Sequence, residues 1–177
     1  LYMAIVAIAS VLVTGRYELA ILLPKNDRDA LHIVALSVGL SCAISALLLL
    51  VVVLFNSQIT QLLGASDIAP WLYWGPASTV LMGIYTSLNY WSNRKSQYKR
   101  LAISRTVQSG SASLAQLGSG FAGAGNMGLV GGQITGQLLS TTVLARLIWR
   151  EDSRLVQAIE KRRMVVLAKK YINFPKY

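Results

Sequence analysis

The Lys and Arg residues of this chain, 17 in all, are confined to four patches that are separated by long uncharged stretches. The patches cover residues 16–28, 94–105, 146–163 and 169–176, and formal charge is absent from residues 30–66, 68–93 and 106–145. Lipid hydrocarbon excludes charged side chains, and short loops rich in Lys and Arg stay on the cytoplasmic side of a membrane. The pattern therefore predicts an all-α, polytopic transmembrane helix bundle in which every second loop is basic.

The composition of the chain supports this class. Hydrophobic residues make up 54% of it, charged residues make up 14%, and the mean hydropathy is +0.49. A net charge of +10 would indicate nucleic-acid binding in a water-soluble protein. Here the basic residues flank apolar segments, so we expect membrane lipids as partners and no nucleic acid. Cys42 and His32 are the only residues of their kinds, so we expect no disulfide within the chain, no metal site and no cofactor.

The apolar segments predict about five membrane-spanning helices. A spanning helix needs about 20 apolar residues, and aromatic residues mark its ends at the headgroup interfaces. The expected spans cover residues 1–23, 31–55, 71–91, 103–124 and 127–149. The last two divide one uncharged stretch of 40 residues at a Gly-rich turn near Gly125 and Asn126. Residues 1–149 are thus expected to form one transmembrane bundle.

The loops predict the orientation of this bundle in a multi-pass cytoplasmic membrane protein. Loops 24–30 and 92–104 and the tail 150–177 are basic, whereas the loop between spans two and three carries only Asp67. The basic segments are therefore expected on the cytoplasmic side, with the first span entering from outside. Such a start predicts an earlier span that is missing from the chain. We expect the tail to be a basic amphipathic linker leading to a further absent helix, or else an ordinary solvated linker.

Polar residues inside the expected spans are candidates for a substrate cavity. Arg16 lies between apolar turns, where a charge costs roughly 2.5–3.5 kcal/mol on insertion scales, and it could face a cavity or extend to the headgroups. Glu18 is about 200° away around the helix, so these two residues cannot pair on one face. Uncharged polar stripes on spans three to five could line a sugar-binding pocket or could bond the helices together. Their candidate members are Asn89, Gln108, Gln133 and Gln137.

Small residues recur every four positions in two of the expected spans. Gly128, Gly132 and Gly136 form one such series, and Ser37 and Ser41 with Ser45 form the other. Small side chains at this spacing let helix backbones approach one another closely. We therefore predict that both series are sites of helix–helix packing.

Three motifs resemble one family when they are read in order along the chain. The motifs are residues 16–25 (RYELAILLPK), residues 90–95 (YWSNRK) followed by 101–105 (LAISR), and residues 171–177 (YINFPKY). They resemble the prokaryotic polysaccharide flippases, the Wzx-type lipid-linked oligosaccharide translocases of the multidrug/oligosaccharidyl-lipid/polysaccharide exporter superfamily. The resemblance covers essentially the whole chain, and it implies that the chain matches helices two to six in the N-terminal bundle of a MATE-like fold.

The resemblance also implies a function, which is to flip undecaprenyl-diphosphate-linked oligosaccharide across the membrane by alternating access. The product would serve O-antigen, capsule or exopolysaccharide biosynthesis, with the polysaccharide polymerase and the chain-length machinery as expected partners. On this interpretation Arg16 is a cavity cation and Arg94 and Arg105 contact the diphosphate at the cytoplasmic mouth. Glu18 would couple transport to an ion gradient or serve as a structural partner of a basic residue.

Two alternatives stay open at this point. A sister exporter of the same superfamily would share the fold and carry a drug or a peptidoglycan precursor. A membrane enzyme acting on lipid-linked sugars would need acidic residues, His or Arg in a sizeable loop for acid–base work. The loops expected on the external side hold one Asp and no His, so we do not expect an enzyme.

Overall fold

The structure is a computed structural model that describes residues 13, 17–62, 72–121, 123, 126–156 and 161–170. Its helices are α2 (Tyr17–Ala20), α3 (Asp27–Leu62), α5 (Trp74–Arg94), α6 (Tyr98–Phe121), α7 (Asn126–Val156) and α8 (Lys161–Lys170). No strand occurs among the residues described, which confirms the predicted all-α class.

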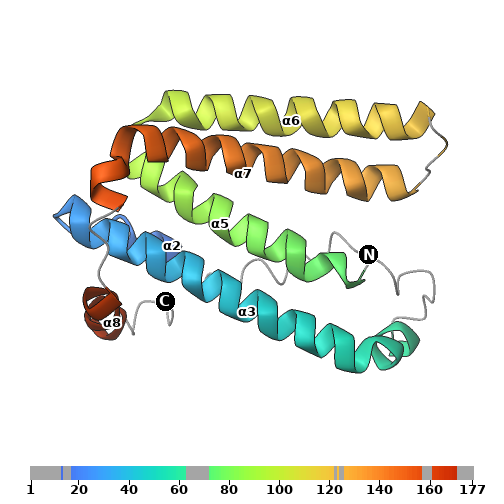
Figure 1. The fold of residues 1–177 in the computed structure, drawn as a ribbon, viewed down its shortest axis with the longest axis horizontal. Helices are drawn as coiled ribbons and strands as arrows, with labels where there is room; N and C mark the ends of the chain where they lie inside the picture. The colour runs from blue at the N-terminus through green and yellow to red at the C-terminus, as the bar shows by residue number, and fades with distance from the viewer. Residues whose placement is uncertain are drawn as a thin grey trace.

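The four long helices run alongside one another, as Figure 1 shows. α6 packs chiefly on α7, α7 also packs on α5, and α5 packs on α3. The short helix α8 lies against α3, near the end of the bundle at which α3 begins. Because successive long helices alternate in direction, α3 and α6 begin at the end of the bundle where α5 and α7 finish.

α3 is the most apolar helix of the bundle. Among the described residues it is also the only helix that is long and apolar enough to cross a membrane, and an 18-residue stretch within Asp27–Gln61 has a mean hydropathy of 2.8. It continues past the expected span of residues 31–55 and is interrupted at Phe55, whose backbone is not helical (φ −119°, ψ 16°). The polar residues Asn56, Ser57 and Gln58 follow directly, so the backbone break coincides with the end of the apolar run.

Within the described part of the chain only α3 meets this measure of length and hydropathy, so the predicted number of about five spanning helices is not confirmed. α5, α6 and α7 are 21, 24 and 31 residues long, but they contain many Ser, Thr, Gln and Gly residues that lower their hydropathy. Most of the first expected span, residues 1–23, lies outside the described residues.

The turns at the charged end are shorter than the sequence predicted. α5 ends at Arg94 and α6 begins at Tyr98, so most of the expected loop 92–104 is helical. The turn is closed by two backbone hydrogen bonds of 2.9 Å, from Ser96 N–H to Asn93 O and from Gln97 N–H to Ser92 O. Ser96 has a positive φ of 54°, which allows the chain to reverse within three residues.

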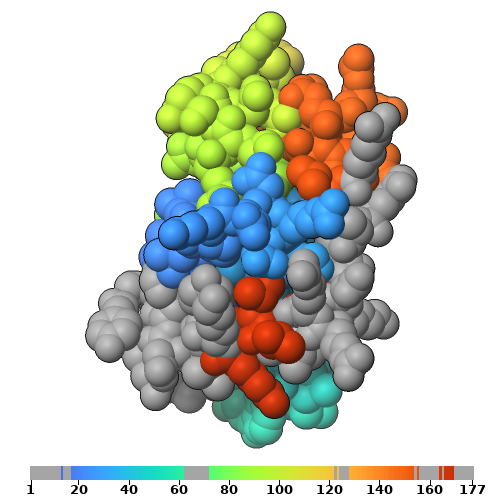
Figure 2. Space-filling view, turned by 90° about the vertical axis from the view of Figure 1, so that its left-hand side faces the viewer, coloured from blue at the N-terminus to red at the C-terminus, as the bar shows by residue number. Residues whose placement is uncertain are grey.

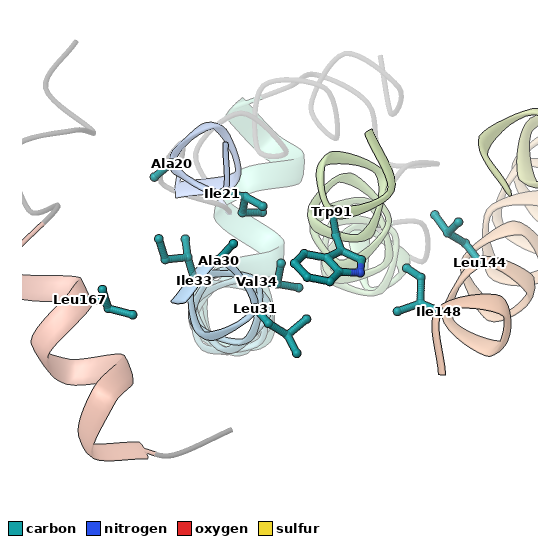
Figure 3. Close-up of a cluster of buried hydrophobic side chains, with 10 residues drawn as sticks. All are labelled: Ala20, Ile21, Ala30, Leu31, Ile33, Val34, Trp91, Leu144, Ile148 and Leu167. Atoms are coloured by element: carbon teal, nitrogen blue, oxygen red, sulfur yellow. The ribbon is translucent and has the colours of Figure 1, made fainter. Parts of the chain in front are cut away.

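A cluster of buried apolar side chains lies toward this same end and joins five helices (Figure 3). In the close-up, Trp91 of α5 lies between the side chains of α3 and those of α7. The cluster consists of Ala20, Ile21, Ala30, Leu31, Ile33, Val34, Trp91, Leu144, Ile148 and Leu167. Burial of an apolar side chain of this kind stabilises a fold by about 1.5–3 kcal/mol in water, so the cluster fixes the end of the bundle where the charged residues gather.

Candidate functional site

The charged residues of the long helices gather at one end of the bundle. Figure 2 views the molecule from this end, where the start of α3 lies between α8 on one side and α6 and α7 on the other. The opposite ends of α3, α5, α6 and α7 carry no charged residue within the described ranges. The described parts of the basic segments that were predicted to lie on one side of a membrane therefore share one end of the molecule.

Asp27, the first residue of α3, pairs with two basic residues at the end of α5. Its carboxylate oxygens lie 3.3 Å from Arg94 Nε and 2.7 Å from Lys95 Nζ. Asp27 precedes the apolar segment that begins at Leu31. The hydrogen bond from Lys95 is the largest cause that lowers the pKa of this carboxyl, and with the Arg94 contact it outweighs the opposing effect of burial.

Arg94 also fixes the turn that follows α2. Its guanidinium donates to the carbonyl oxygens of Ile21, Leu22 and Lys25 at 3.2, 3.3 and 3.4 Å. These three residues follow α2 in the turn that leads to α3, where buried or half-buried carbonyl groups need a partner outside regular secondary structure. Only 12% of the Arg94 side chain is exposed. Arg94 therefore joins α5 to the turn between α2 and α3.

Arg100 forms a second ion-pair cluster with the end of α7. Its guanidinium lies 3.0 Å from Asp152 Oδ2 and, through Nε, 3.0 Å from Glu151 Oε2, with a further close contact from its second amino group to Glu151. The side chains of Arg100 and Asp152 are 5% and 9% exposed, whereas that of Glu151 is 48% exposed. A buried charge is strongly unfavourable without a partner, so these groups depend on one another.

Trp91 extends this cluster to a third helix. Its indole Nε1 donates to the same Asp152 Oδ2 atom at 3.1 Å, and its side chain is fully buried. Asp152 lies at a break in α7, where its backbone departs from helical angles (φ −115°, ψ 15°). One carboxylate thus holds α5, α6 and α7 together at the point where α7 bends.

A surface hollow of about 560 Å³ opens over the turn between α2 and α3. Its described walls all belong to one segment and are Lys25, Asn26, Asp27, Arg28 and Asp29. Acidic and basic groups are mixed in these walls, so the hollow has no single charge that would select a ligand.

The charged residues predicted for a substrate site have different surroundings. Arg94 is engaged as described above, whereas Arg105 is exposed on α6 and has no ion-pair partner among the described residues. Glu18 on α2 is half-buried, and one of its carboxylate oxygens is buried without a hydrogen-bond partner within the described chain. Arg16 lies outside the described residues, so its position relative to Glu18 is not described.

The predicted amide residues do not share one environment. Gln137 is buried between α7 and α5, where its Nε2 lies 3.2 Å from Met82 Sδ, whereas Gln133 is exposed on α7. Asn89 on α5 and Gln108 on α6 are half-buried. The structure therefore brings Gln137 to the contact between α5 and α7, whereas Gln108 lies at the contact between α6 and α7, next to Gly136.

The two series of small residues lie at helix contacts, as predicted. A Cβ atom on Gly132 would lie 2.5 Å from Gln116 Cγ, and one on Gly136 would lie 2.7 Å from Ala112 Cβ and from Gln108 O. Such distances leave no room for a side chain, so α6 and α7 approach closely along this stripe. Between α3 and α5, the hydroxyls of Ser37 and Ser87 are hydrogen-bonded at 2.8 Å, which confirms the second packing site.

Sequence reasoning missed the carboxylates that organise this end. A signal for them was present, because the chain has seven acidic residues and all but Asp67 lie in or next to the basic patches. An acidic residue inside a basic patch indicates a specific ion pair rather than general repulsion. The basic residue that each carboxylate contacts depends on how the helices are aligned. The spacing of residues along the chain does not show this alignment.

Comparison of this chain with models of known protein families, with curated proteins and with solved structures finds no match.

Proposed function

We propose that this chain is part of a polytopic transporter of the prokaryotic cytoplasmic membrane that moves a lipid-linked oligosaccharide between leaflets. Two features support the proposal: the three motifs that resemble polysaccharide flippases, and an arrangement of residues that suits lipid surroundings. The observation that carries the membrane part of the proposal is the outer face of α6, where a basic residue at one end is followed by aliphatic and aromatic side chains.

The outer face of α6 has the length and polarity of a lipid-facing surface. Lys99, Ile103, Leu114, Leu117 and Phe121 fall within an arc of about 60° at 100° per residue. All five are exposed, with Leu114 at 73% and Phe121 at 93%. The apolar members, from Ile103 to Phe121, extend about 27 Å, close to the roughly 30 Å thickness of bilayer hydrocarbon. Exposed apolar side chains gathered on one face of a helix mark contact with a membrane or a partner.

α3 presents a similar apolar surface. Leu47, Leu50 and Leu54 are 62%, 55% and 64% exposed, and the segment of residues 31–55 would be about 37 Å long. Beyond Phe55, the side-chain amide of Asn56 donates to Tyr73 Oη at 3.0 Å. Polar and aromatic residues at this depth are typical of a headgroup interface, so α3 has the features of one membrane crossing.

The interior of the bundle is correspondingly rich in hydroxyl groups. Ser37, Ser41, Ser87 and Ser140 are completely buried, and most such hydroxyls donate to a carbonyl oxygen one turn earlier in the same helix. Helices in lipid associate through small and hydroxyl-bearing residues because aliphatic side chains gain little by leaving lipid. Buried hydroxyls at the helix contacts, together with exposed aliphatic side chains on α3 and α6, support the proposed five-span bundle.

Within a transporter, the charged end of the bundle would face the cytoplasm and meet the substrate's diphosphate. Arg105 is exposed and unpaired among the described residues, so it could bind a phosphate without losing an ion pair. Arg94 would first have to leave Asp27 and three carbonyl groups, and we assign it a structural role. Glu18 retains its proposed role in ion coupling because one of its oxygens lacks a partner among the described residues.

The test uses the intact protein in cells that depend on it for surface polysaccharide. Loss of the protein should leave lipid-linked oligosaccharide in the inner leaflet, and Arg105→Gln should reduce export at a normal protein level. The matched variant Lys25→Gln removes an exposed charge from the turn between α2 and α3 and should leave export unchanged. Normal surface polysaccharide in cells without the protein would contradict the oligosaccharide assignment, and export of a drug or a peptidoglycan precursor would identify a sister transporter.

A further inference from the structure

The described outer face of α7 carries two arginines and a tryptophan that the proposed transport cycle does not use. Arg146, Trp149 and Arg150 are all exposed, Trp149 at 55%, and they fall within an arc of about 100° on the helix. Neither arginine has a carboxylate partner among the described residues. The acidic residues that follow, Glu151 and Asp152, are held by Arg100.

The same face of α7 becomes aliphatic toward the middle of the bundle. Leu138 and Leu139 are 49% and 43% exposed, and with the arginines and Trp149 they fall within an arc of about 120°. Leu138 lies about 18 Å along the helix axis from Arg150. The face therefore has two cations at one end, an amphipathic indole beside them and, beyond the exposed Thr142, two leucine side chains.

We infer that the Arg146–Trp149–Arg150 face of α7 binds the headgroup of an anionic phospholipid, with an acyl chain along Leu138 and Leu139. Guanidinium groups bind phosphate oxygens through paired hydrogen bonds, and two of them one turn apart can share one phosphodiester. A zwitterionic headgroup would place its cationic amine near the two arginines, which repel it. A headgroup with net negative charge therefore binds these arginines more tightly than a zwitterionic one. Tryptophan prefers the headgroup level, which is where its position beside the arginines would place it.

The aliphatic strip favours a lipid over a free phosphate ion, because a soluble anion would leave Leu138 and Leu139 without a partner. The site also differs from the proposed substrate contact at Arg105, which is on α6. This inference rests on the proposed placement of the bundle in a membrane, but it does not depend on what the protein transports.

The test measures quenching of tryptophan fluorescence in the intact protein, reconstituted in vesicles that contain brominated phosphatidylglycerol or brominated phosphatidylcholine. Bromine quenches only an indole that its lipid contacts, so the two quenching curves give a relative affinity. Each basic residue near a membrane surface contributes about fivefold in affinity for anionic lipid, so the preference for phosphatidylglycerol should lie between about fivefold and 25-fold. Trp149→Phe should remove the lipid-selective component of quenching.

The double variant R146Q/R150Q should bring the relative affinity to about one, with an unchanged thermal unfolding midpoint. The matched control K25Q/R28Q removes the same charge from exposed positions at and beside the turn between α2 and α3, and should retain the preference. An equal loss in both double variants would overturn the inference, because it would show general attraction to the vesicle charge. Quenching by both lipids without preference would overturn the lipid site alone, whereas no quenching by either would also contradict membrane placement.

Discussion

Trp91 and Asp152, 61 positions apart in the chain, are joined by a 3.1 Å hydrogen bond from the indole nitrogen to a carboxylate oxygen. The same oxygen accepts a hydrogen bond from Arg100 at 3.0 Å. All three side chains are buried, and each belongs to a different long helix. The ends of α5, α6 and α7 are therefore held by one carboxylate, and this cluster fixes the alignment of the three helices.

Asp152→Asn should destabilise the intact protein far more than Glu151→Gln. The first change leaves the buried Arg100 with only its more exposed partner, and loss of one partner in a buried pair costs about 3 kcal/mol or more. Glu151 is half-exposed, so its removal should cost about 1 kcal/mol or less. Thermal unfolding of the two variants in detergent measures the difference. Equal shifts of the unfolding midpoint would show that the buried carboxylate has no special role.

Gly136→Ala should loosen the contact between α6 and α7, whereas Gly131→Ala should not. A methyl group at residue 136 would meet Gln108 O and Ala112 Cβ at 2.7 Å, and overpacking of this kind costs about 1–3 kcal/mol. At residue 131 nothing lies within 4 Å, and Ala is favoured over Gly in a helix by roughly 0.5–1 kcal/mol. The two free energies of unfolding should change in opposite directions, and a stabilised Gly136→Ala protein would contradict the close approach.

The ion pairs of Asp27 should make stability depend on pH in the acid range. Lys95 and Arg94 lower the pKa of Asp27 below its ordinary value of 3.8, so the folded state favours the ionised carboxylate. This contribution is fully present above the unfolded pKa and is lost as the pH falls through the folded pKa. Unfolding midpoints of the wild type and Asp27→Asn should thus differ at pH 6 and converge as the pH falls below about 3.8. A constant gap across this range would contradict the prediction.

Leu50→Arg should impair membrane insertion, whereas Gln58→Arg should not. Leu50 is 55% exposed within the apolar run of α3, and an arginine near the middle of a span costs about 2.5–3.5 kcal/mol on insertion scales. Gln58 is also exposed but follows the break at Phe55, where the residues are polar. The amount of each variant in carbonate-washed membranes tests this, and normal insertion of Leu50→Arg would show that this face does not meet lipid.

The sequence predicted the helices better than it predicted their ends. Uncharged stretches of sufficient length indicated the long helices α3, α5, α6 and α7 in order. The predicted helix ends were wrong where the helices include charged residues. α6 begins at Tyr98 rather than near residue 103, and α7 continues to Val156 rather than ending at residue 149. Arg100 and Asp152 can be buried there because each neutralises the other, and this pairing depends on contacts between distant segments.

The candidate site was predicted only in part for a similar reason. Spacing identified the glycine stripe, because contact through small residues leaves a repeat along a single helix. It could not show that Arg94 would be engaged by Asp27 or that Gln133 and Gln137 would differ in exposure. The partner of Arg94 and the exposure of the two glutamines depend on which helix packs against each residue. A repeat within one helix does not identify the neighbouring helix.

The most direct test of membrane placement and orientation is the labelling of two single-cysteine variants of the intact protein in which Cys42 is replaced by Ser. Gln58→Cys and Gln97→Cys put exposed thiols near opposite ends of the bundle, the first beyond the break in α3 and the second in the turn between α5 and α6. A membrane-impermeant maleimide should label Cys at position 58 in intact cells and should label position 97 only after the membrane is permeabilised. Labelling of both positions in intact cells, or of neither until permeabilisation, would contradict a bundle that crosses the membrane with its basic end in the cytoplasm.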